Sequence, residues 1–247
     1  MPVTLPRSVP ADYVASREAL HRVAAHVLAR RRETVTGRFG LRATPGGFGT
    51  PQFGDPDHEE TLRVAGPALV REHRDGDGPH TAVAALDHAT LRDLAAFVGV
   101  DLDPAFRVGT DTPDLGDVTA PLRIDVAAAQ LVGDVLAVGA MALDRTLAAL
   151  GAEAAPTVAQ LWPEHFDLGL DVAAGGSRAN LGLSLGDHYH DEPYAYVGPW
   201  GAARPGDAAY WNVGFGALLG YDGFATSGDP VDAIVAFFHR GLQLLAG

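Results

Sequence analysis

Hydrophobic residues recur at helical spacing in three long segments of the chain. In the first segment, Leu20, Val27 and Leu28 fall on one side of a helical wheel. In the last, Asp229 and Pro230 are the favoured residue types at the N-cap and the first helical position. The three predicted helices cover residues 11–33, 125–150 and 230–245. A shorter helix is predicted over 90–98, after Thr90 as N-cap.

The other hydrophobic positions alternate with polar ones in short runs, separated by glycine and proline. These runs lie in two regions, one on each side of the second long helix. The predicted strands cover residues 38–42, 48–53, 61–64, 68–72, 81–86, 166–172, 179–185 and 193–198. Residues 208–219 suggest one further helix. Because strands and helices do not alternate strictly, the pattern predicts an α+β fold, with a mostly antiparallel sheet flanked by the three long helices.

The length of 247 residues allows one large domain or two small ones, and we expect a single domain over 1–247. Residues 99–122 form a proline- and aspartate-rich loop that could separate two sub-halves, 1–110 and 121–247. Each half contains a helix, glycine-rich strands and a shorter helix. This order suggests two pseudo-repeated halves, although no repeat is visible at the level of residues.

Composition excludes several kinds of chemistry. There is no cysteine, and all 18 basic residues are arginine, so thiolate, iron–sulfur and Schiff-base chemistry are absent. A net charge of −13 argues against nucleic acid and against anionic membrane surfaces as partners. The apolar stretch 126–143 contains Gln130 and Asp134, which favours a buried core helix over a membrane span. We therefore expect a cytoplasmic protein.

Polar residues gather on one face of the predicted strands 166–172 and 179–185. Alternation turns the leucines toward the core and leaves Gly169 and Gly182 on the opposite face, where they could leave a hollow for a ligand. Tyrosine and tryptophan nearby could form the wall of such a pocket, or the edge of a core or an oligomer interface. An ordinary solvated sheet face remains the alternative. The candidate ligand-binding residues are His165, Asp167, Asn180, Ser184, Tyr194, Tyr196 and Trp200.

A His-x-His pair follows the second of these strands. On a strand, both imidazole rings would point to one side, and imidazole with carboxylate is a usual donor set for zinc or manganese. Such a divalent metal could activate water for hydrolysis. The alternative is a polar loop between strands. The candidate metal ligands are His165, His188, His190 and Asp191, with Asp167 or Asp191 as ligand or base. The histidines in the first helix, His21 and His26, are typical of surface or interface positions.

Four short motifs, in their order along the chain, are similar to those of a family of bacterial proteins. They are Leu20-His21 in the first predicted helix, Trp162-Pro163-Glu164-His165-Phe166-Asp167-Leu168, Glu192-Pro193-Tyr194-Ala195-Tyr196 and Ala236-Phe237-Phe238. The chain resembles uncharacterised bacterial proteins of a domain-of-unknown-function family with FDLA-like and tyrosine-rich Y-x-Y segments, although Gly169 stands where alanine is expected. The resemblance implies a single two-part domain and no particular activity.

Three hypotheses about function follow. The leading one is a small-molecule-binding protein that uses the polar sheet face and the aromatic residues. The second is a metal-dependent hydrolase, and the third is an interaction module that forms a homo-oligomer through its aromatic residues.

Overall fold

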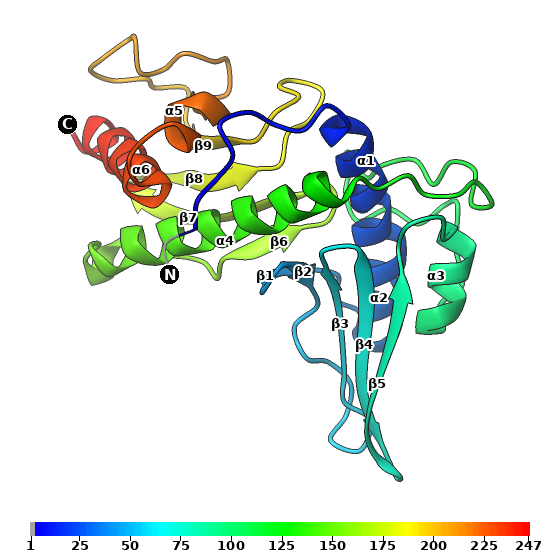
Figure 1. Cartoon of the computed structure of the whole chain (residues 1–247). Coiled ribbons are helices and arrows are strands. Elements are labelled where there is room, and N and C mark those ends of the chain that lie inside the picture. Colours follow the sequence, from blue (N-terminus) through cyan, green and yellow to red (C-terminus); the bar gives the residue numbers. More distant parts are fainter. Residues whose placement is uncertain (1–2) are drawn as a thin grey trace. The chain divides into compact units, whose positions relative to one another are not determined.

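The computed structural model describes residues 3–247, and the chain forms two compact units (Figure 1). Unit 1 comprises Met1–Val9, Asp134–Gln160 and Asp167–Gly247. Unit 2 comprises Pro10–Gly133 and Leu161–Phe166. The two units divide within the helix α4 (Val126–Ala148), rather than in the loop 99–122.

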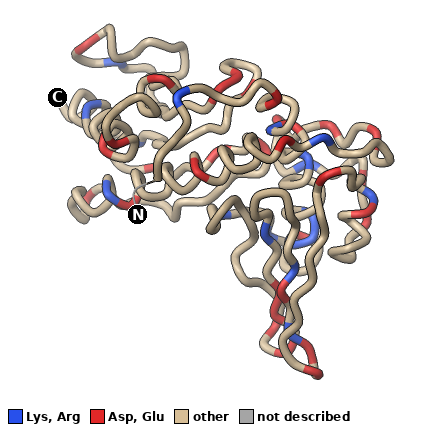
Figure 2. The backbone as a smooth tube through the Cα atoms, in the orientation of Figure 1, with Lys and Arg blue, Asp and Glu red and all other residues tan. Residues whose placement is uncertain are grey.

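The predicted α+β fold is confirmed. Two five-stranded antiparallel sheets form, and each is a meander whose strands are neighbours in chain order, β1-β2-β3-β4-β5 and β6-β7-β8-β9-β10. The three predicted long helices are also present. Among the described residues, Asp, Glu and Arg are interspersed along both units (Figure 2).

Unit 2 begins with one continuous helix in three parts, α1 (Tyr13–Val23), the π-helical segment η1 (Ala24–Ala29) and α2 (Arg30–Thr36). Gly37 ends it in the left-handed conformation, with φ of +70°, which glycine adopts without strain. The strands follow, and then α3. Their bounds are β1 (Arg42–Thr44), β2 (Gly47–Gly49), β3 (Glu60–Ala65), β4 (Ala68–Asp75), β5 (Gly78–Ala85) and α3 (Leu91–Val98).

Local sequence signals account for several of these boundaries. Thr90 caps α3 in a capping box, in which its hydroxyl accepts from the Asp93 N–H and the Asp93 carboxylate accepts from the Thr90 N–H. The β3–β4 hairpin turns at Gly66-Pro67, as predicted. Buried leucine, valine and phenylalanine side chains on the sheet and on the long helix form the core of this unit.

Unit 1 contains the later part of α4 and the second sheet. Its elements are η2 (Ala152–Ala154), β6 (Gln160–Trp162, of which Leu161–Trp162 belongs to unit 2), β7 (Asp167–Ala174), β8 (Ser177–Ser184), β9 (Tyr194–Pro199), β10 (Ala217–Gly220), α5 (Tyr221–Ala225) and α6 (Pro230–Ala246). Asp229 caps α6 as predicted, by accepting hydrogen bonds from Val231 and Asp232. The connection of β7 to β8 is a two-residue turn, Gly175-Gly176, which is shorter than the loop the sequence indicated.

The apolar face of this second sheet is buried, as the alternation predicts. Leu168, Leu170, Leu181 and Leu183 have 5% or less of their surface exposed. Gly139 of α4 packs so closely on Leu183 that an added Cβ would lie 2.8 Å from the Leu183 Cδ2. On α6, Gly241 similarly makes room for the ring of Tyr210, whose hydroxyl would lie 2.4 Å from an added Cβ, and for Val197.

The helix predicted over residues 208–219 is wrong, and the strand predicted over 38–42 overlaps the observed β1 only at Arg42. Residues 208–219 do not form a helix, since turns and an isolated bridge precede β10 there. Tertiary hydrogen bonds override the helical pattern, because the Tyr210 hydroxyl donates to the Phe237 carbonyl and the Trp211 indole N–H donates to the Pro205 carbonyl.

α4 is the one described helix that is long and apolar enough, by length and composition, to cross a membrane. In its most apolar window, 61% of the residues are buried inside the structure, and the core helix of a soluble protein meets the same criteria.

Candidate functional site

Strand register brings five of the predicted ligand-binding residues onto one face of the unit 1 sheet, namely Asp167, Asn180, Ser184, Tyr194 and Tyr196. Asp167 lies opposite Ser184 across β7 and β8, and Ser184 lies opposite Tyr194 across β8 and β9. Gly182 lies between Gly169 and Tyr196 in the same way. Cross-strand partners share a face, so the polar side of the sheet has the composition that the sequence predicts.

The hollow expected above the glycines is filled. An added Cβ on Gly182 would lie 2.4 Å from the Cζ and Oη atoms of Tyr196, and one on Gly169 would lie 2.7 Å from that Oη. The Tyr196 hydroxyl donates a hydrogen bond to the Oδ2 of Asp167. The expectation of open space above the glycines is therefore wrong, because the Tyr196 ring packs on them and the sequence pattern did not indicate which way that ring turns.

A second tyrosine–aspartate pair lies beside the first. The Tyr194 hydroxyl donates to the Oδ2 of Asp187 at 2.7 Å. Burial raises the pKa of both Tyr194 and Tyr196 above the ordinary tyrosine value, and the neighbouring carboxylates raise it further. Both phenols therefore stay protonated and act as hydrogen-bond donors within the fold.

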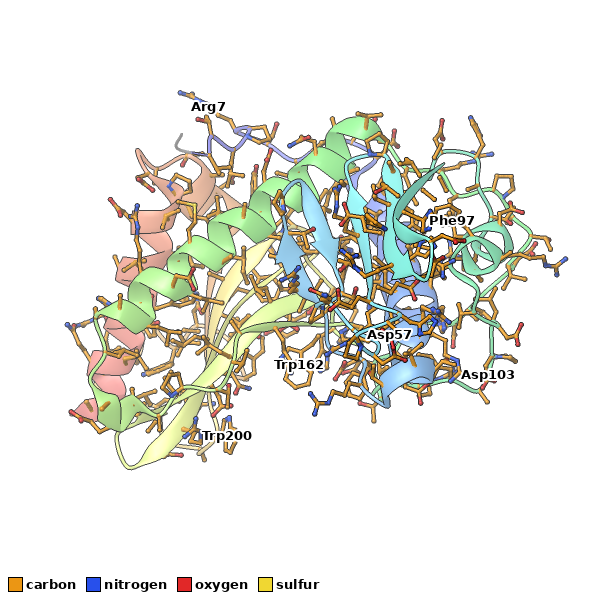
Figure 3. All side chains as sticks on the ribbon, turned by 90° about the horizontal axis from the view of Figure 1, so that it is seen from below. Arg7, Asp57, Phe97, Asp103, Trp162 and Trp200 are labelled. Carbon is orange, nitrogen blue, oxygen red and sulfur yellow. The ribbon has the colours of Figure 1, made fainter. Side chains whose placement is uncertain are left out.

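Trp200 and Asn180 form a separate pair on this polar face. The Trp200 indole N–H donates to the Oδ1 of Asn180 at 2.8 Å. Trp200 follows the end of β9 with 62% of its surface exposed, and Figure 3 shows its side chain away from the ribbon. The tryptophan is thus held at the surface rather than in the wall of a pocket.

The His-x-His pair lies in a loop and not on a strand. Asp187 organises the loop, because its Oδ1 accepts from the Tyr189 N–H at 2.7 Å and from the His190 N–H at 3.1 Å. The Asp187 N–H in turn donates to the His190 carbonyl. Such aspartate-capped turns compete with strand formation, which explains why the two rings are not aligned as on a strand.

The four predicted metal ligands do not form one donor set. His165 belongs to unit 2, in the turn before β7, where its Nδ1 lies 3.3 Å from the Asp111 Oδ2 and 51% of its side chain is exposed. His188, His190 and Asp191 belong to unit 1. Within residues 3–247, no group of three or more His, Asp or Glu side chains is placed to hold a metal ion.

A cavity in unit 2 gathers charged residues that the sequence patterns did not single out. It has a volume of about 470 Å³, which is within the usual range for small-molecule sites. One wall is a stripe of α1 at helical spacing, and the other comes from the loop that precedes α4. The lining residues are Ala15, Glu18, Ala19, His21, Arg22, Pro113, Asp114, Pro121 and Arg123. We call this the His21 cavity.

His21 is held as a neutral imidazole. Its Nε2 lies 2.9 Å from the Pro163 carbonyl oxygen, and because a carbonyl only accepts, Nε2 carries the proton. Burial lowers the pKa of His21 to about 4, and the charges of Arg17 and His165 act in the same direction. In the neutral ring, Nδ1 is then the nitrogen left to accept a hydrogen bond.

The charges around the His21 cavity are unevenly compensated. Glu18 lies 3.6 Å from Arg17, and Asp114 lies 3.6 Å from Arg107. By contrast, no carboxylate of the described chain lies within 4 Å of the guanidinium of Arg22 or Arg123. Glu18 and Asp114 therefore each have a cationic partner, whereas Arg22 and Arg123 have no carboxylate partner within 4 Å among residues 3–247.

The loop wall of the cavity is fixed from the helix. His26 lies in η1, and its Nε2 donates to the Pro113 carbonyl at 2.7 Å, next to Asp114. Burial lowers the pKa of His26, so this ring is also neutral near pH 7. The interpretation of His26 as a histidine with a satisfied structural bond is consistent with this geometry, whereas His21 faces a cavity.

Comparisons with known proteins found no matching family model, no matching curated protein and no matching solved structure. The resemblance to a family of unknown function therefore stays a prediction.

Proposed function

We propose that the protein binds a small carboxylate or phosphate compound in the His21 cavity. The observation that carries this proposal is the presence of Arg22 and Arg123 at one cavity without carboxylate partners. Guanidinium groups bind carboxylate and phosphate through paired N–H donors, so these two arginines fit an anion.

His21 adds a requirement on the ligand. A neutral imidazole whose Nε2 is already bonded offers an acceptor nitrogen, so the preferred compound carries a hydroxyl or amine donor besides its anionic group. The small side chains of Ala15 and Ala19 leave room beside these polar groups. This proposal keeps the small-molecule hypothesis but assigns it to α1 and the loop before α4, rather than to the sheet face.

Thermal unfolding tests the proposal. A panel of carboxylates and phosphate monoesters, each with its uncharged amide or alcohol analogue, is added at constant ionic strength. Binding at a hundredfold excess over Kd stabilises by about 2.7 kcal/mol, which corresponds to a rise in Tm of roughly 5–10 °C for a chain of this size. At least one anionic compound should give this rise, and its uncharged analogue should not.

Variants separate the cavity from general ion effects. Arg22→Gln combined with Arg123→Gln should abolish the shift. Arg38→Gln removes an exposed arginine outside the cavity and should leave the shift unchanged. An anion that stabilises the double variant as much as the original protein would contradict the proposal, and so would a panel in which no anion raises Tm.

A further inference from the structure

The outer edge of β5 is open. β5 is the last strand of its sheet, and it pairs with β4 along its whole length, from Ala85 opposite Ala68 to Gly78 opposite Asp75. In an antiparallel strand, every second residue turns its N–H and C=O away from that ladder. Within the described chain, no other hydrogen bond reaches a backbone group of β5. In Figure 1, the β4–β5 hairpin extends well past the ends of β1 and β2.

The sequence of β5 does not protect this edge in the usual ways. Proteins commonly prevent edge pairing with charged side chains, bulges or very short edge strands. β5 has eight residues and no Asp, Glu or Arg, whereas its neighbour β4 carries charged residues of both signs. Pro79 interrupts hydrogen bonding only near the start of the strand. Val83 has 63% of its surface exposed.

We propose that β5 pairs antiparallel with β5 of a second copy of this chain, about a two-fold axis that passes between the two strands. Such a contact joins the two β1–β5 sheets into one continuous sheet. Main-chain hydrogen bonds supply the attraction, as in other cases of strand addition. A two-fold contact is also the commonest symmetry of protein oligomers.

The absence of charge is what favours a second copy over an unrelated strand. In a two-fold contact, each residue meets residues of an identical strand, so a charged side chain near the axis would lie close to its own copy. β5 has no Asp, Glu or Arg between Gly78 and Ala85, and its single histidine, His80, lies beside Asp75 near the hairpin turn. An edge that selects a different charged partner would instead carry complementary charges.

The geometry also gives the exposed valine a partner. When the axis is perpendicular to the sheet, paired residues keep to one face, so they differ by an even number of positions. Val83 of one copy then lies beside Pro79, Thr81, Val83 or Ala85 of the other, depending on register. Each of these registers covers apolar surface of Val83 that the single chain exposes.

Salt should strengthen this contact. Each copy carries a net charge of −13, so two copies repel each other at low ionic strength. At 0.1 M, salt screens the repulsion between charges that lie more than about 10 Å apart. The main-chain hydrogen bonds of the interface join neutral groups, so salt does not weaken them in the same way. A dimer held by ion pairs would weaken under the same conditions.

Sedimentation velocity over a range of protein concentrations, at low and high NaCl, tests the proposal. We expect a monomer–dimer equilibrium that shifts toward dimer with salt. Thr81→Lys combined with Val83→Lys should give a monomer with unchanged circular dichroism, and its Tm should match that of the original protein at dilutions where no dimer forms. Because this variant lowers the net negative charge, long-range repulsion between copies cannot explain a loss of dimer. Val126→Lys combined with Val158→Lys is the matched control on other exposed valines and should still dimerise.

Amide hydrogen exchange locates the interface independently. Exchange in residues 78–85 should slow at concentrations where the dimer forms, and it should not slow in the Thr81→Lys, Val83→Lys variant. The proposal is overturned if the protein is monomeric at all concentrations and salt levels, if the lysine variant dimerises as well as the control, or if protection appears elsewhere and not in β5.

Discussion

The imidazole of His21 is stacked on the ring of Phe166, with centroids 5.1 Å apart and planes within 6° of each other. Phe166 has a positive φ of 53°, and its ring also packs edge-on against Phe48. A non-glycine residue in this conformation is uncommon and persists where surrounding structure holds it. The stacking fixes His21 from one side, while the Pro163 carbonyl fixes it at Nε2.

Stability should therefore fall as the pH is lowered from about 6.5 to about 4. The pKa of His21 is lowered to about 4 in the folded protein, so in this window the unfolded chain takes up a proton that the folded chain does not. The stability lost at His21 across the window is on the order of 3 kcal/mol. Urea unfolding at a series of pH values measures it.

His21→Gln should make this pH dependence shallower, whatever it does to stability at pH 7. The lowered pKa of His26 leaves some dependence in place. His88→Asn is the control, since His88 is exposed and asparagine tolerates its positive φ of 62°. If the free energy of unfolding depends on pH equally steeply in the His21 variant and in the original protein, His21 is not neutral in the folded protein.

Gly182→Ala should destabilise the protein through a clash with the Tyr196 ring. The new Cβ would lie 2.4 Å from ring atoms, which forces the ring or the strands to move, and overpacking of this kind costs about 1–3 kcal/mol. Chemical denaturation of the single variants and of the double variant with Tyr196→Ala measures the coupling. The alanine should cost less than half as much when Tyr196 is absent.

Gly198→Ala serves as the control for the Gly182 variant. It introduces the same methyl group on the same sheet face, but its nearest neighbour would be the Asn180 Cβ at 3.9 Å, an ordinary contact. Its effect should stay within about 0.5 kcal/mol. If the free-energy cost of the double variant equals the sum of the costs of Gly182→Ala and Tyr196→Ala alone, the Tyr196 ring does not lie on Gly182.

Asp187→Ala should loosen the loop that contains the His-x-His pair. The carboxylate accepts from two backbone N–H groups and from the Tyr194 hydroxyl, and all three donors lose their acceptor. We expect the free energy of unfolding to fall by about 1–3 kcal/mol, and the amides of Tyr189 and His190 to exchange faster. Tyr194→Phe, which removes only the hydroxyl, should cost less and leave the exchange of both amides slow. Unchanged exchange in Asp187→Ala would exclude this role.

Glu60→Gln should destabilise unit 2. Glu60 has only 6% of its side chain exposed, and its carboxylate lies 2.8 Å from both Arg31 and Arg71. Neutralising it leaves two partly buried guanidinium groups without a counter-charge, at a cost of about 2–4 kcal/mol. Glu72→Gln breaks the more exposed pair with Arg63 and should cost less than about 1 kcal/mol. Equal midpoints in guanidinium chloride for the two variants would contradict this.

The parts of the fold that follow from short-range rules could be predicted from the sequence. The N-caps at Thr90 and Asp229, and the inward leucines of β7 and β8, depend on side-chain type and on periods of 3.6 and 2 residues. Phe166 is a residue for which these short-range rules give the wrong position. Its hydrophobicity predicts an inward strand residue, but the chain turns before β7 and places it against His21 instead.

The candidate site could not be predicted for a related reason. The α1 wall of the His21 cavity is visible in the sequence as Ala15, Glu18, Ala19 and Arg22 at helical spacing. The opposite wall, around Pro113 and Arg123, lies in a loop without periodicity. Only long-range hydrogen bonds, such as that from His26 to Pro113, place this loop, and a sequence pattern carries no information about them.

The π-helical segment η1 has a consequence for insertions and deletions. A π turn contains one residue more than an α turn, and one residue of an α-helix corresponds to a rotation of about 100°. Deleting a single residue between Ala24 and Ala29 would convert the π turn to regular α-helix and would leave the residues after it at nearly the same angle relative to His21, so Arg31 would still reach Glu60. Adding a residue there would instead rotate Arg31 away from Glu60 by about 100°. This segment therefore tolerates the loss of one residue more readily than the gain of one.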